Sequence, residues 1–151
     1  AGQITDNYWM GDRTWYEHWD SLSMLAHRVY RQAKIDNPLA ELDTAELYNA
    51  FTIQEIIEYE ALGFCEKGKG AELIRKGVTT MEGELPVCPS GGVLCTNPIG
   101  ATGMIRVAEA ALQVMGKAED RQVPDVRKAL AHAWGAAIGF HTLMVLSNEA
   151  P

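Results

Sequence analysis

The sequence predicts an α/β domain in which helices are layered on a sheet. Two observations support this fold class. Segments with helical periodicity alternate with short apolar segments, and the chain closes on two apolar segments, residues 128–134 and 137–146, that are typical of antiparallel strands joined through Gly135. With 151 residues, 47% hydrophobic and 22% charged, the composition is that of an ordinary globular protein, and the length suits one domain or one half of a duplicated enzyme.

The first predicted helix covers residues 14–33. Thr14 is the expected N-cap, and Glu17 three residues later completes a capping box. Asn37-Pro38 ends the pattern, because a proline disfavours a helical conformation in the residue before it. The apolar positions that recur at helical spacing are Trp15, Trp19, Leu22, Leu25, Ala26, Val29 and Ala33.

The rest of the chain predicts one more strand and three more helices. Residues 45–51 indicate a short strand that leads into a tight connection, after which Thr52 caps a helix over 53–62 that Gly63 ends. Residues 64–89 are mostly irregular, with a short helix at 71–76. A longer amphipathic helix covers 104–115 and stops at Gly116. Its apolar face consists of Ile105, Ala108, Leu112 and Met115.

Charge and cysteine content narrow the functional classes. The formal net charge of −7 argues against broad nucleic-acid contact, which needs basic surface, but leaves room for one local pocket for coenzyme A. Three cysteines favour neither a disulfide framework nor a metal site, and a reducing cytoplasm is the expected compartment. No apolar run reaches the ~18–20 residues that span a bilayer, and the first residues do not resemble a signal peptide.

A glycine-rich loop, residues 97–103, directly precedes the longer helix. The start of a helix exposes unpaired N–H groups and the positive end of its dipole, which favour anions and developing oxyanions. The glycines permit close backbone approach to a ligand, and Asn97 adds a side-chain N–H donor. The alternative interpretation is an ordinary loop that only caps the helix.

Three blocks in order resemble the thiolase superfamily. Residues 89–92 (Pro-Ser-Gly-Gly) and 97–103 (Asn-Pro-Ile-Gly-Ala-Thr-Gly) are similar to the thiolase segment N-P-S-G-G … G-H-P-x-G-A-[ST]-G. Residues 46–51 are similar to its N-E-A-F or H-D-x-F motif, and residues 130–135 to its penultimate-strand motif. The resemblance extends over about residues 14–147. It implies that residues 1–151 form a thiolase C-terminal domain with a mixed five-stranded sheet, and that the cysteine nucleophile belongs to an N-terminal half.

The sequence departs from the thiolase pattern at two points. Asn97 replaces the histidine of G-H-P, and an asparagine donates a hydrogen bond but is no base at neutral pH. Tyr48, with Asn49 beside it, occupies the place of the upstream Asn or His, which resembles thiolase-like aldolases. The Asn-Pro loop and His-Ala-Trp-Gly look more like bacterial homologues, such as benzoylsuccinyl-CoA thiolase, that work with a small OB-fold/zinc-ribbon partner.

The resemblance assigns the candidate site residues. Those expected in catalysis are Asn97, His132, Tyr48 and Asn49, and those expected to contact substrate or coenzyme A are Gly91, Gly92, Pro98, Gly100 and Gly103. For His132 the alternative is a core histidine bonded to a backbone carbonyl. Cys88 and Cys95 are expected to be small buried hydrophobic residues rather than nucleophiles. No metal and no covalently bound cofactor are expected, and the acyl-CoA thioester is a substrate.

Three functions remain open at this stage. The preferred one is the C-terminal part or subunit of a thiolase-like acyltransferase that makes or breaks a carbon–carbon bond in a 3-oxoacyl-CoA and needs a partner chain. The alternatives are a retro-aldol lyase acting on a β-hydroxyacyl-CoA, marked by Tyr48, and a non-catalytic thiolase-like subunit. Each implies a second half or catalytic subunit, and an OB-fold/zinc-ribbon protein is a candidate further partner.

Overall fold

The centre of the molecule is a mixed sheet. The computed structural model describes residues 1–7, 9–13 and 16–149. Its strands are β1 (Gly2–Thr5), β2 (Thr44–Glu46), β3 (Lys128–Gly135) and β4 (Phe140–Ser147), in the order β1-β4-β3-β2. The pairs β1–β4 and β3–β4 are antiparallel, as predicted for the closing hairpin, and β2–β3 is parallel.

The expected five-stranded sheet is corrected to four strands within the described residues. A single parallel bridge between Ala45 and Val87 lies where a further strand would pair with β2. Pro86 and Pro89 flank this bridge and lack backbone donors, and Cys88 has a positive φ of 52°. The segment therefore leaves the sheet after this single bridge. The N-terminal strand β1, whose Ile4 pairs with His141, was not predicted.

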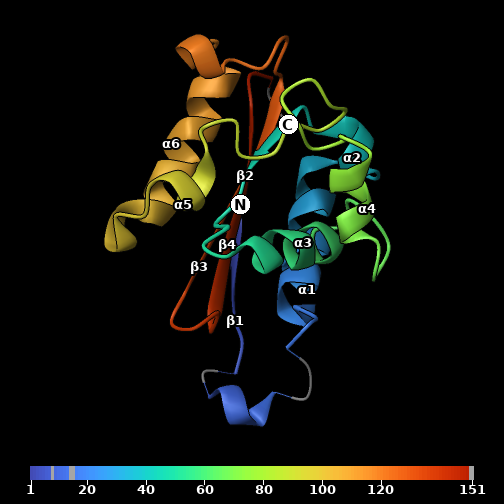
Figure 1. Cartoon of the computed structure of the whole chain (residues 1–151), viewed down its shortest axis with the longest axis vertical. Helices are drawn as coiled ribbons and strands as arrows, with labels where there is room; N and C mark the ends of the chain where they lie inside the picture. Colours follow the sequence, from blue (N-terminus) through green and yellow to red (C-terminus); the bar gives the residue numbers. More distant parts are fainter. Residues whose placement is uncertain (8, 14–15, 150–151) are drawn as a thin grey trace.

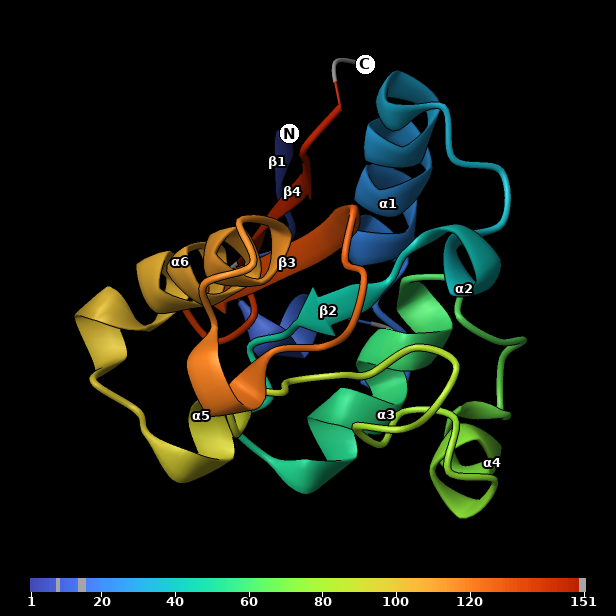
Figure 2. The same ribbon diagram turned by 90° about the horizontal axis from the view of Figure 1, so that it is seen from above.

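Helices cover both faces of the sheet. They are α1 (Asp20–Ala33), α2 (Pro38–Glu41), α3 (Thr52–Ala61), α4 (Gly70–Arg75), α5 (Gly92–Cys95) and α6 (Thr102–Val114). Figure 1 and the view from above in Figure 2 place α6 on one face and α1 with α3 on the other. No helix in the described part of the chain has the length and apolar character needed to cross a membrane.

The first helix begins later than predicted. It starts at Asp20, and Glu17 is not helical, while Thr14 lies outside the described residues. Trp19 precedes the first turn, is buried, and packs its ring on His141 with centroids 5.5 Å apart. Packing of this tryptophan on the sheet thus fixes the point at which the helix begins.

The other predicted elements agree with the structure within a few residues. The helix predicted over 53–62 is α3, which begins at Thr52, so Phe51 rather than Thr52 is the N-cap. The short helix at 71–76 and the longer helix at 104–115 correspond to α4 and α6. The strand predicted over 45–51 ends at Glu46, and Leu47 to Ala50 form an irregular connection.

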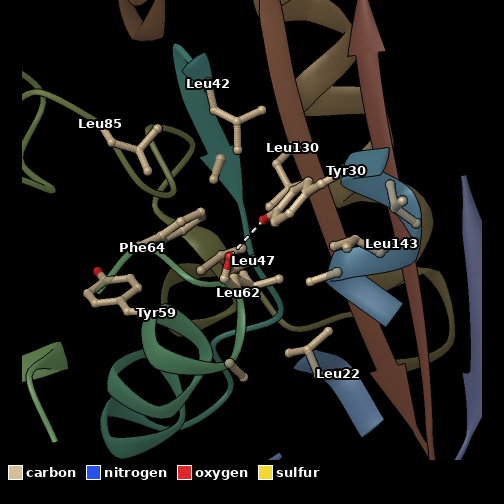
Figure 3. Close-up of a cluster of buried hydrophobic side chains, with 14 of the residues drawn as sticks. Leu22, Tyr30, Leu42, Leu47, Tyr59, Leu62, Phe64, Leu85, Leu130 and Leu143 are labelled. Carbon is tan, nitrogen blue, oxygen red and sulfur yellow. Dashed lines mark hydrogen bonds between the residues drawn. The ribbon is translucent and has the colours of Figure 1, made fainter. Parts of the chain in front are cut away.

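The main hydrophobic core lies between the sheet and the α1–α3 layer. Figure 3 shows leucines from α1, from β3 and from the connection after β2 meeting there, among them Leu22, Leu130 and Leu47, each fully buried. The Tyr30 hydroxyl donates to the Leu62 carbonyl at 2.9 Å, so the polar atom of this buried ring is satisfied. A smaller cluster on the opposite face joins α6 to the sheet and consists of Ala110, Val123, Val126, Ala129 and Ala131.

Helix α6 turns an unexpected side to the sheet. The buried positions are Thr102, Arg106, Ala110 and Gln113, three of which are polar. The apolar face predicted from the periodicity is less buried: Ala108 and Met115 are exposed, and Ile105 and Leu112 are half-buried. The helix therefore presents an apolar stripe away from its own domain.

Candidate functional site: a cleft beside helix α6

A cleft of about 550 Å³ lies between the start of α6 and the facing sides of β3 and β4. Three of the predicted site residues, Tyr48, Gly100 and Gly103, line it together. The other lining residues are small or apolar apart from Thr142, and they are Ile99, Met104, Val107, Ala131, Ala133, Trp134, Gly135, Ala136, Phe140 and Met144. Tyr48 is the one titratable side chain among the described residues of this cleft.

The position of Tyr48 is fixed by Trp134. Tyr48 follows β2 by two residues, on the same side as Glu46, which faces α6. The two rings lie with centroids 4.6 Å apart, and the Trp134 indole donates to the Tyr48 carbonyl at 2.8 Å. Because Trp134 contacts both the ring and the backbone carbonyl of Tyr48, it restricts the position of the Tyr48 hydroxyl.

The loop into α6 is capped by Asn97. This exposed side chain accepts hydrogen bonds from the Ile99 backbone N–H at 3.2 Å and the Thr102 hydroxyl at 3.0 Å. Asn97 and Pro98 are not among the described cleft-lining residues. Ile99 is highly exposed and has a φ of 47°, a strained conformation for a β-branched residue. Strain of this kind is concentrated at functional sites.

The two loop glycines that line the cleft have different surroundings. At Gly103 a Cβ would lie 3.0 Å from the Ala133 Cβ, so this glycine permits α6 to approach β3 closely. At Gly100 nothing lies within 4 Å of a Cβ position. Gly100 therefore leaves open space at the cleft, where a ligand would meet bare backbone.

The Gly91–Gly92 turn is packed against Asn49. Both glycines have positive φ, 89° and 62°, and a Cβ on Gly92 would overlap the Asn49 amide. The buried Asn49 side chain accepts from the Val93 N–H at 2.8 Å and donates to Glu55 at 2.6 Å. These contacts account for Asn49 and both glycines structurally, and their contact with coenzyme A stays a prediction.

A buried charge network lies beneath this turn and was not predicted. The Arg106 guanidinium donates to Glu46 Oε2 at 2.6 Å and to the Ser90 hydroxyl at 2.9 Å. Ser90 donates its N–H to Glu46 Oε1 at 3.0 Å and its hydroxyl to Glu46 Oε2 at 2.8 Å. Burial raises the pKa of Glu46, and the Arg106 charge opposes that rise. The sequence signal that could have indicated this network is Glu46, a charged residue within a predicted apolar strand.

His132 lies on the face of the sheet opposite the cleft. Side chains alternate along β3, so Ala131 and Ala133 line the cleft while His132 points into the α1–α3 layer, fully buried. Its neighbours are side chains rather than a backbone carbonyl: His141 at 3.1 Å and Glu58 at 3.3 Å. Burial raises the pKa of Glu58 and lowers that of His132, so burial favours the uncharged form of each side chain.

The three cysteines are free thiols. Cys88 is buried as expected, its sulfur accepts from the Leu47 N–H at 3.3 Å, and burial raises the pKa of its thiol well above the usual value. Burial also raises the pKa of Cys65, to about 11. Cys95 was expected to be buried and is exposed, because it ends the short helix α5 at the surface. In the described residues, no three His, Cys, Asp or Glu side chains converge as a metal site.

This layered α/β fold, with a capped glycine loop opening onto a cleft, is that of a thiolase-type domain. Residues 2–148 match the family model described as thiolase C-terminal domain-like, and the chain belongs to that family. Acetyl-CoA acetyltransferase from Methanothermobacter thermautotrophicus is 31% identical over 149 residues, which are 98% of this chain and 38% of that protein. The benzoylsuccinyl-CoA thiolase subunit BbsB from Thauera aromatica is 38% identical over 112 residues, 73% of this chain and 29% of that subunit.

Two further similarities extend this relationship. Sterol carrier protein 2 from Oryctolagus cuniculus is 40% identical over 111 residues, 73% of this chain and 20% of that protein. A solved structure of the Ltp2-ChsH2(DUF35) aldolase superposes with a TM-score of 0.77 at 23% identity, covering 97% of this chain and 38% of that chain, which shows a shared fold. The chain spans between a fifth and two-fifths of the length of these relatives.

Proposed function

We propose that this chain is the C-terminal part or subunit of a thiolase-like acyltransferase that cleaves or forms a carbon–carbon bond in a 3-oxoacyl-CoA. The cleft that brings Tyr48 together with the glycine loop at the start of α6 carries this proposal. Relatives named as an acetyl-CoA acetyltransferase and a thiolase subunit support the same reaction class. An N-terminal half, in the same polypeptide or another, supplies the nucleophilic cysteine.

In the proposed reaction this domain stabilises the thioester enolate. The cysteine of the other half attacks the 3-oxo carbon, the C2–C3 bond breaks, and its electron pair forms the enolate of the departing acyl-CoA. Backbone N–H groups at the start of α6 bind the enolate oxygen, and a proton returns to C2. A second coenzyme A thiol then takes the acyl group from the cysteine. Asn97, Pro98 and the two cleft glycines form the loop that carries these N–H groups.

The missing half is proposed to cover the apolar stripe of α6. Met104 and Met115 are exposed on this helix, together with Ile99 on the loop before it. An apolar helix face left uncovered in one domain is typical of a protein–protein interface. With that half in place, water would be excluded from the cleft, and the loop N–H groups would act in a less polar environment. A small OB-fold/zinc-ribbon protein is the proposed further partner.

Tyr48 supports a second candidate, a retro-aldol lyase. It is the titratable group in the described lining of the cleft, whereas His132 points away. A tyrosinate would take the proton from the 3-hydroxyl of a β-hydroxyacyl-CoA. The C2–C3 bond would then break to give a carbonyl compound and a thioester enolate, which is protonated at C2. This reaction needs neither a cysteine nor free coenzyme A.

The coenzyme A requirement separates the two candidates. The complete enzyme is incubated with a 3-oxoacyl-CoA or a β-hydroxyacyl-CoA, with and without free coenzyme A, and the products are identified by mass spectrometry. We expect cleavage of the 3-oxoacyl-CoA that requires coenzyme A and is blocked by iodoacetamide. Cleavage of the hydroxy substrate without coenzyme A would favour the lyase, and no cleavage of either would refute both.

Tyr48→Phe sharpens this test. The variant keeps the ring contact with Trp134 and removes the hydroxyl alone. A lyase should lose ~10²-fold or more in kcat, the range expected for an acid–base group, whereas cysteine-dependent thiolysis should continue. Met144→Leu in the same cleft is the matched control, because it conserves volume and carries no acid–base group.

A further inference from the structure

We propose that Glu46, Ser90 and Arg106 are positioning residues that hold Tyr48, the Gly91–Gly92 turn and the start of α6 in one fixed arrangement. This inference rests on the proposed function, because it treats the cleft as the reaction site. None of the three lines the cleft. They act through the backbone segments that they connect.

The contacts form a closed network among three chain segments. Glu46 ends β2, Ser90 belongs to the turn, and Arg106 lies in the second turn of α6. Both Glu46 oxygens accept hydrogen bonds from Ser90, one from its N–H and one from its hydroxyl, and Oε2 also accepts from Arg106. The Ser90 hydroxyl oxygen in turn accepts from Arg106 at 2.9 Å and from the Gly92 N–H at 3.2 Å.

Two members of the network lie close in the sequence to a residue that lines the cleft. Glu46 precedes Tyr48 by two residues, and Arg106 follows Gly103 by three. A change at any member therefore alters the relation between the tyrosine and the helix start. Misplacement of a reacting group by about 1 Å can cost on the order of 10²-fold in rate.

Burial explains why the two charged members, Glu46 and Arg106, need each other. Glu46 is fully buried and Arg106 nearly so, which makes either charge costly without the other. A buried ion pair adds little net stability compared with apolar residues, but its directional hydrogen bonds favour one arrangement over others. An unpaired carboxylate at Glu46 would also repel an enolate forming at the neighbouring cleft. The pair cancels that charge.

Ser90→Ala tests the inference in the complete enzyme. It removes the hydroxyl that joins the turn to Arg106, while the Arg106–Glu46 pair remains. We expect kcat to fall by roughly tenfold or more with KM within about twofold of wild type, and Ser90→Thr, which restores the hydroxyl, to recover most of the loss. Glu109→Gln is the matched control, because it breaks the partly exposed pair between Glu109 on α6 and Arg121 beyond the end of that helix, and should leave kcat unchanged.

A second readout is independent of activity. With 5-fluorotryptophan incorporated, the Trp134 resonance, assigned through Trp134→Phe, reports on the ring that contacts Tyr48. Ser90→Ala should shift this resonance, and Glu109→Gln should not. Unchanged kcat and an unmoved resonance in Ser90→Ala would overturn the inference. If the wild-type enzyme cleaves no acyl-CoA, the proposed function fails by itself, and the fluorine shift still decides whether the network positions Tyr48.

Discussion

Two buried polar clusters lie on opposite faces of the sheet and differ in how their charges are compensated. On the α6 face, Glu46 and Arg106 pair at 2.6 Å, and Ser90 completes their hydrogen bonds. On the α1–α3 face, Glu58, His132 and His141 are all buried, and within the described residues a single hydrogen bond, between the two imidazoles, connects them. The first cluster contains an ion pair and is well connected, whereas in the second burial favours the neutral forms and the hydrogen bonds are few.

The atoms left without partners show the same contrast. In the described residues, both Glu58 oxygens, His132 Nδ1 and His141 Nε2 have no hydrogen-bond partner, whereas Arg106 Nε is the one such atom of the other cluster. The charges that act on the second cluster are Glu55 on Glu58, and Asp6 and Arg13 on His141. Beside the cleft a counter-charge therefore accompanies the buried carboxyl group, while on the opposite face burial favours the neutral forms.

Removing one member of the Glu46–Arg106 pair should lower the free energy of unfolding more than any other change considered. Arg106→Met leaves Glu46 buried without a counter-charge, and the free energy of unfolding should fall by about 3–5 kcal/mol. Urea denaturation followed by circular dichroism measures the change. The double variant Glu46→Gln/Arg106→Met should recover a large part of the loss. Equal loss in the single and double variants would mean that the charge pairing does not matter.

Glu58→Gln should raise the free energy of unfolding at pH 7, whereas Arg106→Met should lower it. The folded-state pKa of Glu58 is raised by burial, so the contribution of this one group to stability is fully present below its unfolded pKa of ~4.3 and is lost as the pH rises through the folded pKa. Glutamine cannot ionise, so at pH 7 the variant should be more stable by about 1–3 kcal/mol, with the advantage vanishing near pH 4. Thermal unfolding across this range measures it, and an advantage that does not depend on pH would contradict the account.

His141 should contribute to the loss of stability that accompanies a fall in pH. Burial lowers the pKa of His141 to about 4, so its neutral form contributes stability that is present above the unfolded pKa of ~6.5 and lost as the pH falls through about 4. His141→Gln should flatten the curve between these values by roughly 2–3 kcal/mol, because each unit of pKa difference corresponds to about 1.4 kcal/mol. Denaturant midpoints at pH 7, 5.5 and 4.5 provide the comparison. If the variant lost stability at low pH as steeply as the wild type does, a group other than His141 would be taking up the proton.

The smallest effect on the free energy of unfolding is expected for the partly exposed pair between Glu109 of α6 and Arg121, which follows that helix. Arg121 and Glu109 lie 3.2 Å apart and are partly exposed. Glu109→Gln should change the free energy of unfolding by about 0–1 kcal/mol, because solvent screens exposed ion pairs. The same unfolding measurements include this variant, and a loss approaching that of Arg106→Met would remove the distinction between buried and exposed pairs on this helix.

Local patterns in the sequence predicted much of the fold. The β3–β4 hairpin and the helices α3, α4 and α6 follow from apolar periodicity and from glycines at their ends, such as Gly63 and Gly116 with positive φ. The start of α1 and the strand β1 could not be predicted in the same way. Both depend on contacts with β4 that lie far along the chain, Trp19 on His141 and Ile4 opposite His141.

The candidate site was predicted less completely. The motifs identified Tyr48, Gly100 and Gly103, which line the cleft. A motif does not tell which strand residues point to which face of the sheet, so it did not show that Ala133 faces the cleft and His132 the opposite side. Periodicity identified the apolar stripe of α6 without showing that it faces away from the sheet. The Glu46–Arg106 pair joins residues 60 positions apart, beyond the reach of local patterns.

Deuterium incorporation tests the central claim that the cleft stabilises a thioester enolate. Both candidate reactions return a proton to C2, so turnover of the complete enzyme in D2O should place one deuterium on the α carbon of the acyl-CoA product. Gly100→Val projects into open space, so it should fold normally while blocking the loop N–H groups. We predict a labelled product from the wild-type enzyme and at least roughly a tenfold loss of labelling rate in the variant. Unlabelled product, or equal rates in the two proteins, would contradict the account.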